Sequence, residues 1–372
     1  MINYQSRQQK IYDAMAREGI ALLVIEDTEG RKNPALRWLC GHPQDAILCL
    51  SVDKKSLLIP WDVNMALLYS NADTTLPYGE FERRPVKAVK GAAEKLKIPL
   101  GSKIEIAPVT PYPLFLDYVG ALTNYDVICR DTGLHGELDK LRAIKDEEEI
   151  RIYREAAEIT NDIIALLEKN IRSGKIRTEL DAALFIESAS RKRGCEGTGF
   201  TTLAAGPERS FGIHAFPPYT AAPFAGKGLS ILDFGIKYAG YTTDVTLTFV
   251  REPSSAQEKL VTLTEKAYKL ALGLVNNGTG TREIARAVDE YFFSKSRKVM
   301  PHGLGHGIGL EEHENPAIRN RGDNPWVFCP GMVFTLEPGL YDPIHGGCRL
   351  ENDILLTDSG AEVLTTAAII YL

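Results

Sequence analysis

The first part of the chain alternates between helical and extended hydrophobic patterns. Apolar residues recur with helical spacing over residues 7–18, and short apolar runs at residues 20–25, 46–51 and 56–60 are typical of strands. This alternation predicts an α/β domain that extends from residue 1 to about residue 135.

A second pattern begins near Gly136. A charged helix is predicted from residue 144 onward, and its apolar positions Ala156, Ile159, Ile163 and Leu167 follow helical spacing. Because 372 residues are many for one hydrophobic core, we predict two domains, residues 1–135 and 136–372.

Residues 232–249 alternate with the period of two that marks a strand with one buried face. Val245, Leu247 and Phe249 would share the apolar face. Asp244 and Thr246 would share the opposite face. The acid is therefore expected to face a polar site and not the core.

A loop at residues 237–240 would fold this segment into a hairpin that pairs Ile236 with Tyr241. In that register Asp233 lies opposite Asp244, at roughly 5 Å, where like charges destabilise a sheet. A hairpin of this kind predicts that a positive charge lies between the two acids.

A matching pair of acids, Glu337 and Glu351, flanks a second turn further along the chain. The two pairs belong to a faint internal duplication with a spacing of 104 residues, in which each half holds two helices and a hairpin. The matched residues are Gly174 with Gly278, Glu179 with Glu283, Leu180 with Ile284, and Asp233 with Glu337. The second helix of each half would begin at a capping threonine, Thr178 or Thr281. Two such halves would face each other across one central site, where the four carboxylates meet.

Three of the seven histidines, His302, His306 and His313, fall within residues 301–316. A helix would place the first two on one face, as in some zinc proteases, but the alternating glycines each weaken a helix by about 1 kcal/mol. A phosphate-binding glycine loop is a second alternative, and it lacks the required strand before and helix after. We therefore predict extended, closely packed backbone here.

Four carboxylates and one imidazole supply mostly hard oxygen ligands. Such ligands favour Mn²⁺, Co²⁺, Zn²⁺ or Fe²⁺ and differ from the thiolate ligands of a structural zinc site. Four acids exceed the needs of one ion. Two divalent ions roughly 3.5 to 4 Å apart would balance these charges and promote the formation of hydroxide from water. The acids thus predict hydrolytic chemistry.

Composition excludes several other classes of function. Hydrophobic content of 44% and charged content of 25% are ordinary for a globular protein, and a net charge of −6 argues against nucleic acid as a partner. We see neither a signal peptide nor a membrane span, and the six cysteines lack the spacing of a disulfide framework or a metal site. A cytoplasmic location is expected.

The acidic and histidine motifs resemble those of the pita-bread metallopeptidases, the M24 family of Xaa-Pro dipeptidase (prolidase), aminopeptidase P and methionine aminopeptidase. The resemblance covers almost all of the second domain, and the first domain looks like the creatinase-type domain of prolidases and aminopeptidases P. It implies an α/β creatinase-like domain followed by an α+β pita-bread domain with pseudo-twofold duplication, and suggests a homodimer. It also implies a site that holds two divalent metal ions, manganese first, with cobalt, zinc or iron as alternatives. The implied metal ligands are Asp233, Asp244, His306, Glu337 and Glu351, with Asp244 and Glu351 bridging the ions.

The same resemblance implies a peptide substrate with proline after the scissile bond. Histidines at the positions of His302 and His313 surround the substrate in the family, and His313 would stabilise the oxyanion while Glu337 shuttles the proton. His214 matches another substrate-facing histidine. Arg349 lies two residues before Glu351, on the same strand face, and would orient a bridging carboxylate or a substrate terminus.

Three positions depart from the family's pattern. Asn352 stands where many relatives have an acid, Leu247 replaces a common arginine, and Ala317 replaces an arginine that helps some prolidases hold a dipeptide's carboxylate. The first two changes would affect the tuning of the site, and Ala317 leaves open whether dipeptides or longer peptides are preferred. Two alternative functions also stay open: a metal-dependent hydrolase of a small non-peptide amide, and a non-catalytic protein-binding module on the same fold.

Overall fold

A computed structural model describes residues 2–372 of the chain. It divides into two compact units, the first of which runs to Arg142 and the second of which is Ala143–Leu372. The division lies at the end of helix α6 (Leu134–Ala143), whereas the sequence placed a boundary near residue 136, inside this helix.

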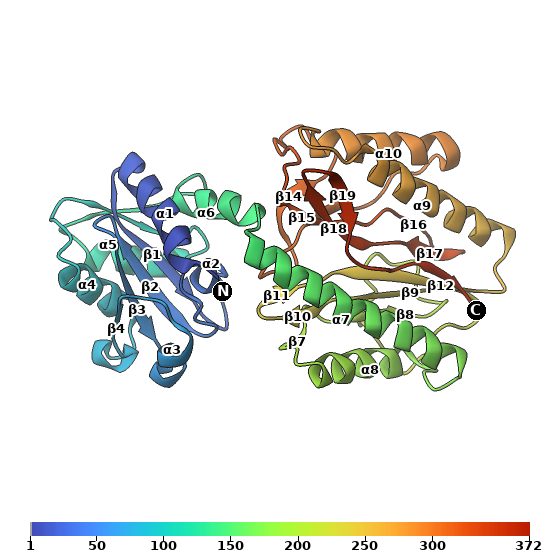
Figure 1. Cartoon of the computed structure of the whole chain (residues 1–372), viewed down its shortest axis with the longest axis horizontal. Coiled ribbons are helices and arrows are strands. Elements are labelled where there is room, and N and C mark those ends of the chain that lie inside the picture. The colour runs from blue at the N-terminus through green and yellow to red at the C-terminus, as the bar shows by residue number, and fades with distance from the viewer. Residues whose placement is uncertain (1) are drawn as a thin grey trace. The chain divides into compact units, whose positions relative to one another are not determined.

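The first unit is built on one six-stranded sheet with the order β4-β3-β2-β1-β5-β6 (Figure 1). Its strands are Ile20–Asp27 (β1), Ala46–Ser51 (β2), Lys55–Pro60 (β3), Thr74–Thr75 (β4), Lys103–Ile106 (β5) and Asp126–Cys129 (β6). Its helices are Tyr4–Glu18 (α1), Ala35–Cys40 (α2), Val63–Tyr69 (α3), the 3-10 turn Tyr78–Phe81 (η1), Pro85–Lys95 (α4) and Tyr112–Ala121 (α5). The predicted first helix and the three predicted strands are all confirmed.

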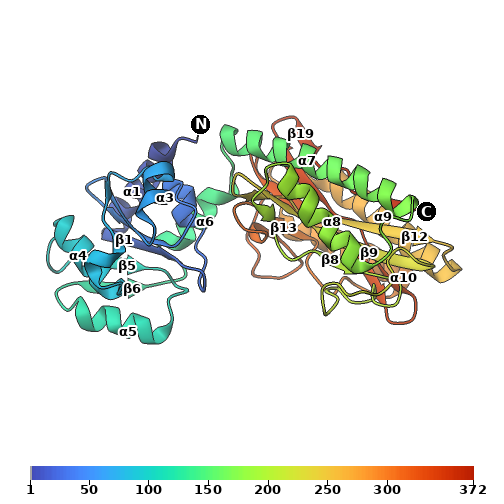
Figure 2. The same cartoon turned by 90° about the horizontal axis from the view of Figure 1, so that it is seen from below.

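Four long helices frame the second unit: Glu147–Arg172 (α7), Glu179–Lys192 (α8), Ser255–Leu274 (α9) and Thr281–Ser296 (α10). They lie in two pairs, α7 with α8 and α9 with α10, outside the strands (Figures 1 and 2). Helix α7 begins at a capping box in which Asp146 accepts from the Glu149 backbone N–H, as expected for this charged start. Its predicted apolar positions lie in or against the core.

The strands of the second unit form several small sheets, of which the larger two have the orders β20-β12-β9-β8 and β14-β13-β15-β18-β19. The strands are Gly197–Thr198 (β7), Leu203–Ala205 (β8), Gly228–Phe234 (β9), Ile236–Tyr238 (β10), Tyr241–Thr242 (β11), Val245–Arg251 (β12), Gly305–Gly307 (β13), Glu314–Ile318 (β14), Val333–Leu336 (β15), Gly339–Asp342 (β16), Gly346–Arg349 (β17), Asn352–Thr357 (β18), Gly360–Val363 (β19) and Ile369–Tyr371 (β20). The two sheets meet where Thr246 and Glu351 exchange backbone hydrogen bonds of 3.4 and 3.1 Å. We call this junction the seam.

The two halves on either side of the seam repeat one order of elements, as the internal duplication predicts. Each helix pair turns through a left-handed glycine, Gly174 with φ +70° and Gly278 with φ +84°. Thr178 caps α8, as predicted. Thr281 does not cap α10, because the cap position is Gly280 and the Thr281 hydroxyl donates instead to the carbonyl oxygen of Ala317.

The register predicted for the first acidic hairpin is wrong. Tyr238 pairs with Tyr241 across a two-residue turn, so Asp233 lies opposite Thr246 and not opposite Asp244. The turn residue Ala239 has a φ of +50°, a conformation that favours glycine or asparagine, and this is why the sequence did not point to it. Because the shift is two residues, both acids keep the predicted face.

Candidate metal centre and active site

Five side chains predicted as metal ligands come together at the seam from separate elements. Asp233 lies in β9 and Asp244 precedes β12, while His306 lies in β13. Glu337 directly follows β15, and Glu351 lies between β17 and β18. Each half of the unit thus contributes acids to one site, as the duplication predicts.

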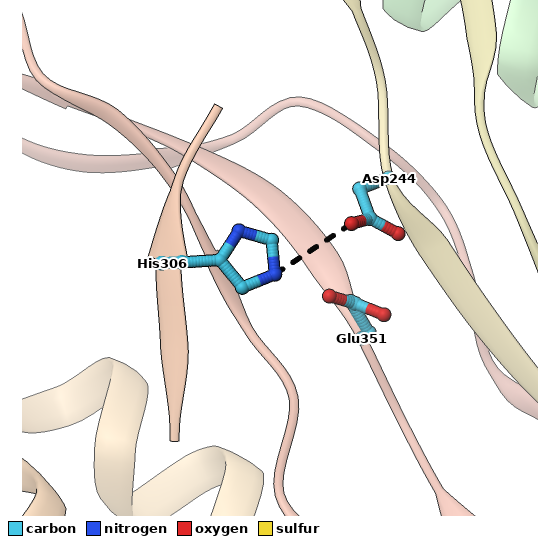
Figure 3. A group of neighbouring side chains, drawn as sticks. All are labelled: Asp244, His306 and Glu351. Atoms are coloured by element: carbon cyan, nitrogen blue, oxygen red, sulfur yellow. Dashed lines mark ion pairs between the residues drawn. The ribbon is translucent and has the colours of Figure 1, made fainter. Parts of the chain in front are cut away.

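Asp244, His306 and Glu351 form the tightest group. One donor atom from each lies within 4.8 Å of the others, and Figure 3 shows the three side chains pointing toward one another. Glu337 extends the group, because its Oε1 lies 3.6 Å from the His306 Nε2. The arrangement is one that could hold a metal ion.

The imidazole of His306 is oriented for metal binding. Its Nδ1 lies 3.2 Å from the carbonyl oxygen of Gly307, which can only accept, so Nδ1 carries the proton in the neutral ring. The lone pair of Nε2 then faces the Asp244 carboxylate at 3.7 Å. A backbone partner that fixes the tautomer in this way is typical of histidine ligands.

Burial changes the protonation of every group in the cluster. Desolvation, with Glu351 nearby, holds the pKa values of Asp244 and Glu337 well above the ordinary range. Desolvation and the Asp233 charge raise the pKa of Glu351 to about 7. Desolvation lowers the pKa of His306 to about 3. The repulsion between the neighbouring carboxylates can be relieved either by protonation or by bound cations.

Arg349 points into the site, as its strand position predicted. Its side chain is 2% exposed, and its Nη2 donates to the Asp233 Oδ2 at 2.7 Å. Its Nε donates to the Thr246 hydroxyl at 3.0 Å, and that hydroxyl donates to the Glu351 Oε2 at 2.8 Å. The guanidinium therefore orients Asp233 directly and Glu351 through Thr246.

Tyr341 is a site residue that the sequence analysis missed. Its hydroxyl accepts from the Arg349 Nη1 at 2.7 Å and lies 3.0 Å from the His302 Nε2. Because the His302 Nδ1 lies 2.7 Å from the Gly303 carbonyl oxygen, Nε2 is the accepting nitrogen of the neutral ring. Burial, followed by the Arg349 charge, lowers the pKa of His302 to about 4, so this neutral form prevails near neutral pH.

Asp353 is a second missed residue. It is fully buried, and its Oδ1 accepts from the Asp244 backbone N–H at 3.1 Å. The face rule that identified Arg349 two residues before Glu351 also identifies Asp353 two residues after it. The side chain of Asn352, in contrast, is hydrogen-bonded outside the acidic cluster. Its Nδ2 donates to the Ala367 carbonyl oxygen, and its Oδ1 accepts from the Ala367 backbone N–H and the Thr365 hydroxyl.

The remaining predicted residues lie at the exposed edge of the cluster. The His313 ring packs on the His306 ring with centroids 4.3 Å apart. His214 is exposed, and it directly follows Ile213, whose carbonyl oxygen accepts from the Arg349 Nη1 at 3.0 Å. The structure thus brings all nine predicted site residues into one region of the second unit.

Close backbone packing explains the glycines of the histidine segment. A Cβ atom at Gly305 would lie 2.1 Å from the Thr335 carbonyl oxygen, and one at Gly307 would lie 2.0 Å from that of Asn315. His306 lies between them in β13, so the predicted extended conformation is confirmed. Glycine is required here because two neighbouring strands leave no room for a side chain.

The donor set fits divalent cations. The Asp233 Oδ1 is buried and has no hydrogen-bond partner within the described residues, although its other oxygen is bound by Arg349. An orphaned buried carboxylate oxygen costs about 1–3 kcal/mol or more, which a bound cation would offset. Oxygen donors with one imidazole are the ligands that such ions prefer.

Comparison with known proteins is consistent with this site. The model of Metallopeptidase family M24 matches residues 151–358, which contain all five acidic and histidine positions described above. The chain belongs to this family. It is therefore a hydrolase of peptide substrates, and M24 membership implies divalent metal ions.

One curated relative matches the chain over both units. An Xaa-Pro dipeptidase of Pyrococcus horikoshii is 27% identical over 371 residues, which are 96% of this chain and 96% of that protein. The first two curated relatives are matched over 66% and 69% of their own length.

Solved structures show the same prolidase and aminopeptidase P architecture, the pita-bread fold. The X-Pro aminopeptidase of Thermotoga maritima matches with a TM-score of 0.84 and 26% identity over 98% of this chain and 99% of that one. The Xaa-Pro dipeptidase of Bacillus anthracis matches with a TM-score of 0.85 and 26% identity over 100% of both chains. The predicted fold class is thereby confirmed.

Within residues 2–372, no helix has the length and apolar character needed to cross a bilayer.

Proposed function

We propose that this M24 peptidase hydrolyses the bond before proline in dipeptides or short peptides. The observation that carries the proposal is the convergence of four acids and the oriented His306 at the seam, beside His302 and His313. The names of the relatives matched over the full length, Xaa-Pro dipeptidase and X-Pro aminopeptidase, supply the substrate class.

Two divalent metal ions, manganese first and cobalt, zinc or iron as alternatives, are proposed as the cofactors. Asp233, Asp244, His306, Glu337 and Glu351 would hold them. Four carboxylates, two of them buried and two half-buried, exceed the charge of a single divalent cation, which supports a count of two. When bound, the ions would lower the pKa of water and so supply the attacking nucleophile.

Glu337 would accept the proton of the attacking water, because burial and its acidic neighbours hold its carboxylate pKa well above the ordinary range and so favour proton uptake. The exposed His313 would donate a hydrogen bond to the oxyanion that develops on the substrate carbonyl. The leaving nitrogen of an Xaa-Pro bond carries no hydrogen and must be protonated as the bond breaks. We propose that Glu337 returns its proton to this nitrogen.

His302, His214 and Arg349 have supporting parts in this proposal. His302 is held by Tyr341 and faces Glu337, with its Nδ1 3.6 Å from the Glu337 Oε2. It would line the substrate site together with His214. Arg349 would act on the substrate only indirectly, because its donors are already directed at protein oxygens.

The test compares Xaa-Pro dipeptides, Xaa-Pro-Yaa tripeptides and matched proline-free peptides with Mn²⁺ or Co²⁺ supplied. We expect hydrolysis of the proline peptides only, together with two bound ions per chain by metal analysis. Equal cleavage of proline-free peptides would overturn the proline assignment. Cleavage of the dipeptide alone would identify a dipeptidase, whereas cleavage of both lengths would identify an aminopeptidase.

A homodimer and a cytoplasmic location stay predictions from the family resemblance and the composition. Free cysteines at all six positions are consistent with a reducing compartment. Sedimentation of the metal-loaded protein would test the dimer.

A further inference from the structure

Residues 206–220 form a loop that lies against the predicted active site, and we call it the site loop. The carbonyl oxygen of Ile213 accepts from the Arg349 Nη1 at 3.0 Å. The Ser210 hydroxyl oxygen accepts from the Gly347 backbone N–H at 3.2 Å. The loop also carries His214, so its position determines where this histidine meets a substrate.

One buried carboxylate holds both ends of the site loop. Glu179, the first residue of α8, is fully buried. Its Oε1 accepts from the Gly206 backbone N–H at 2.8 Å. Its Oε2 accepts from the Thr220 backbone N–H and from the Thr220 hydroxyl, each at 2.7 Å. Glu179 therefore closes the loop at its base, in the manner of a compact Ω-loop with adjacent ends.

The charge of Glu179 is matched from within the loop. The Arg209 Nη1 lies 3.3 Å from the Glu179 Oε2. The Nη2 of the same arginine donates to the carbonyl oxygen of Pro217. The arginine thus ties the two sides of the loop together above the carboxylate. A buried charge that is paired and hydrogen-bonded at both oxygens rigidifies its surroundings.

Helix capping does not explain Glu179. The first turn of α8 is already capped by Thr178 and Asp181, which satisfy each other's backbone N–H groups. The repeat-related position in α10, Glu283, is exposed, and within residues 2–372 its carboxylate accepts no hydrogen bond from a loop end. The buried carboxylate is therefore specific to the half that carries the site loop.

We infer that Glu179 is a positioning residue that fixes the site loop over the metal centre and thereby sets substrate affinity. The inference rests on the proposed peptidase function. The loop presents two exposed apolar side chains, Phe211 at 47% and Phe216 at 94%, in the same segment as His214. Fixing the base of the loop places these side chains where a peptide can contact them without a further ordering cost.

Substitution by glutamine separates this role from simple folding. A carboxamide has one accepting oxygen, so Glu179→Gln can bind Gly206 or Thr220 but must turn N–H groups toward the other end. Thr220→Val is a milder variant, because it removes only the hydroxyl and keeps the backbone N–H. Glu283→Gln is the matched control, since it makes the same chemical change at the repeat-related position.

The experiment uses the metal-loaded full chain and measures hydrogen exchange of residues 206–220 together with the kinetics of a Xaa-Pro dipeptide. For Glu179→Gln we expect exchange in the loop to accelerate about tenfold or more. We also expect KM to rise about fivefold or more while kcat changes by less than about twofold. Thr220→Val should shift both readouts in the same direction by less, and Glu283→Gln should shift neither.

Unchanged loop exchange in Glu179→Gln, or in Thr220→Val if the glutamine variant does not fold, would overturn the inference. A loss of kcat at constant KM would also overturn it, because the residue would then act on the chemistry. Failure of the proposed function looks different: the wild-type chain would not cleave Xaa-Pro peptides, whereas accelerated loop exchange would still mark Glu179 as the loop's clamp.

Discussion

Two side chains of the same residue type at the seam differ in their contacts, and these contacts determine which role each can have. Glu337 and Glu351 are both glutamates, yet Glu351 is fixed by a hydroxyl from Thr246 while Glu337 lies 3.6 Å from two imidazole nitrogens. This difference supports Glu337, and not Glu351, as the proposed proton carrier.

Glu337→Gln is expected to lower kcat by at least about 10²- to 10⁴-fold, because it removes the proposed proton carrier. The readout is hydrolysis of an Xaa-Pro dipeptide at saturating Mn²⁺, with bound metal measured on the same sample. Glu290→Gln, an exposed change, should leave the rate unaffected. Near-wild-type turnover of Glu337→Gln with metal bound would show that another group carries the proton.

Arg349→Met removes donors to four oxygens and leaves the buried Asp233 carboxylate without its cation. Breaking a buried pair on one side costs about 3–5 kcal/mol, so we expect the free energy of unfolding of the metal-free protein to fall by that order. Urea unfolding followed by tryptophan fluorescence measures it. Arg349→Lys keeps the charge but loses the planar fork, and it should recover only part of the difference.

The sequence identified Arg349 but not Tyr341, and the difference is physical. Arg349 shares a strand face with Glu351 two residues away, and this periodicity is visible without a structure. Tyr341 reaches the site from β16, the other strand of the hairpin, in which Gly339 pairs with Arg349. Its hydroxyl meets the guanidinium diagonally across this hairpin, a relation that alternation along one strand does not reveal. The sequence therefore shows which residues share a face of one strand, whereas a neighbour on the next strand depends on the register of the hairpin.

At the scale of elements, the position of each strand decides whether the ligands meet. The predicted acidic hairpin had the wrong turn, yet the prediction that both acids share a face held because the error was an even number of residues. An error of one residue would have turned Asp233 into the core. Alternation of polar and apolar residues therefore predicts faces more securely than it predicts pairings.

Gly307→Ala should displace β13 from β14, because the added Cβ would lie 2.0 Å from the Asn315 carbonyl oxygen. We expect a loss of about 1–3 kcal/mol in stability, together with weaker metal binding as His306 moves. Calorimetric titration with Mn²⁺ measures the second effect. Gly322→Ala is the control, since a Cβ at Gly322 meets nothing within 4 Å. Equal metal affinity in both variants would contradict the predicted displacement.

At the scale of the whole molecule, stability depends on whether protons or cations neutralise the carboxylates at the seam. Five acids there have raised pKa values: the buried Asp244, Glu351 and Asp353 and the half-buried Asp233 and Glu337. Between their unfolded and folded pKa values the native state binds more protons than the unfolded state, so stability falls as pH rises. Buried histidines act in the opposite direction, but only below their unfolded pKa of about 6.5.

The metal-free protein should therefore lose thermal stability between about pH 6.5 and pH 8, where the acids alone determine the slope. The pKa of Glu351, about 7, lies inside this window. Saturating Mn²⁺ should remove most of this dependence and add about 2.7 kcal/mol at a hundredfold excess over Kd. Scanning calorimetry with chelator or with Mn²⁺ provides the test. A metal-free midpoint that rises with pH over this window would contradict the assignment of the buried acids.

Because each half of the second unit supplies ligands across the seam, the order of synthesis matters for assembly. A ribosome that has made β9 and β12 has produced Asp233 and Asp244, but Glu351 follows only after α9, α10 and β15 have been made. The complete set of proposed ligands is therefore present only once the chain has been made as far as Glu351. Assembly of the proposed metal site is consequently expected only after most of the second unit has been made.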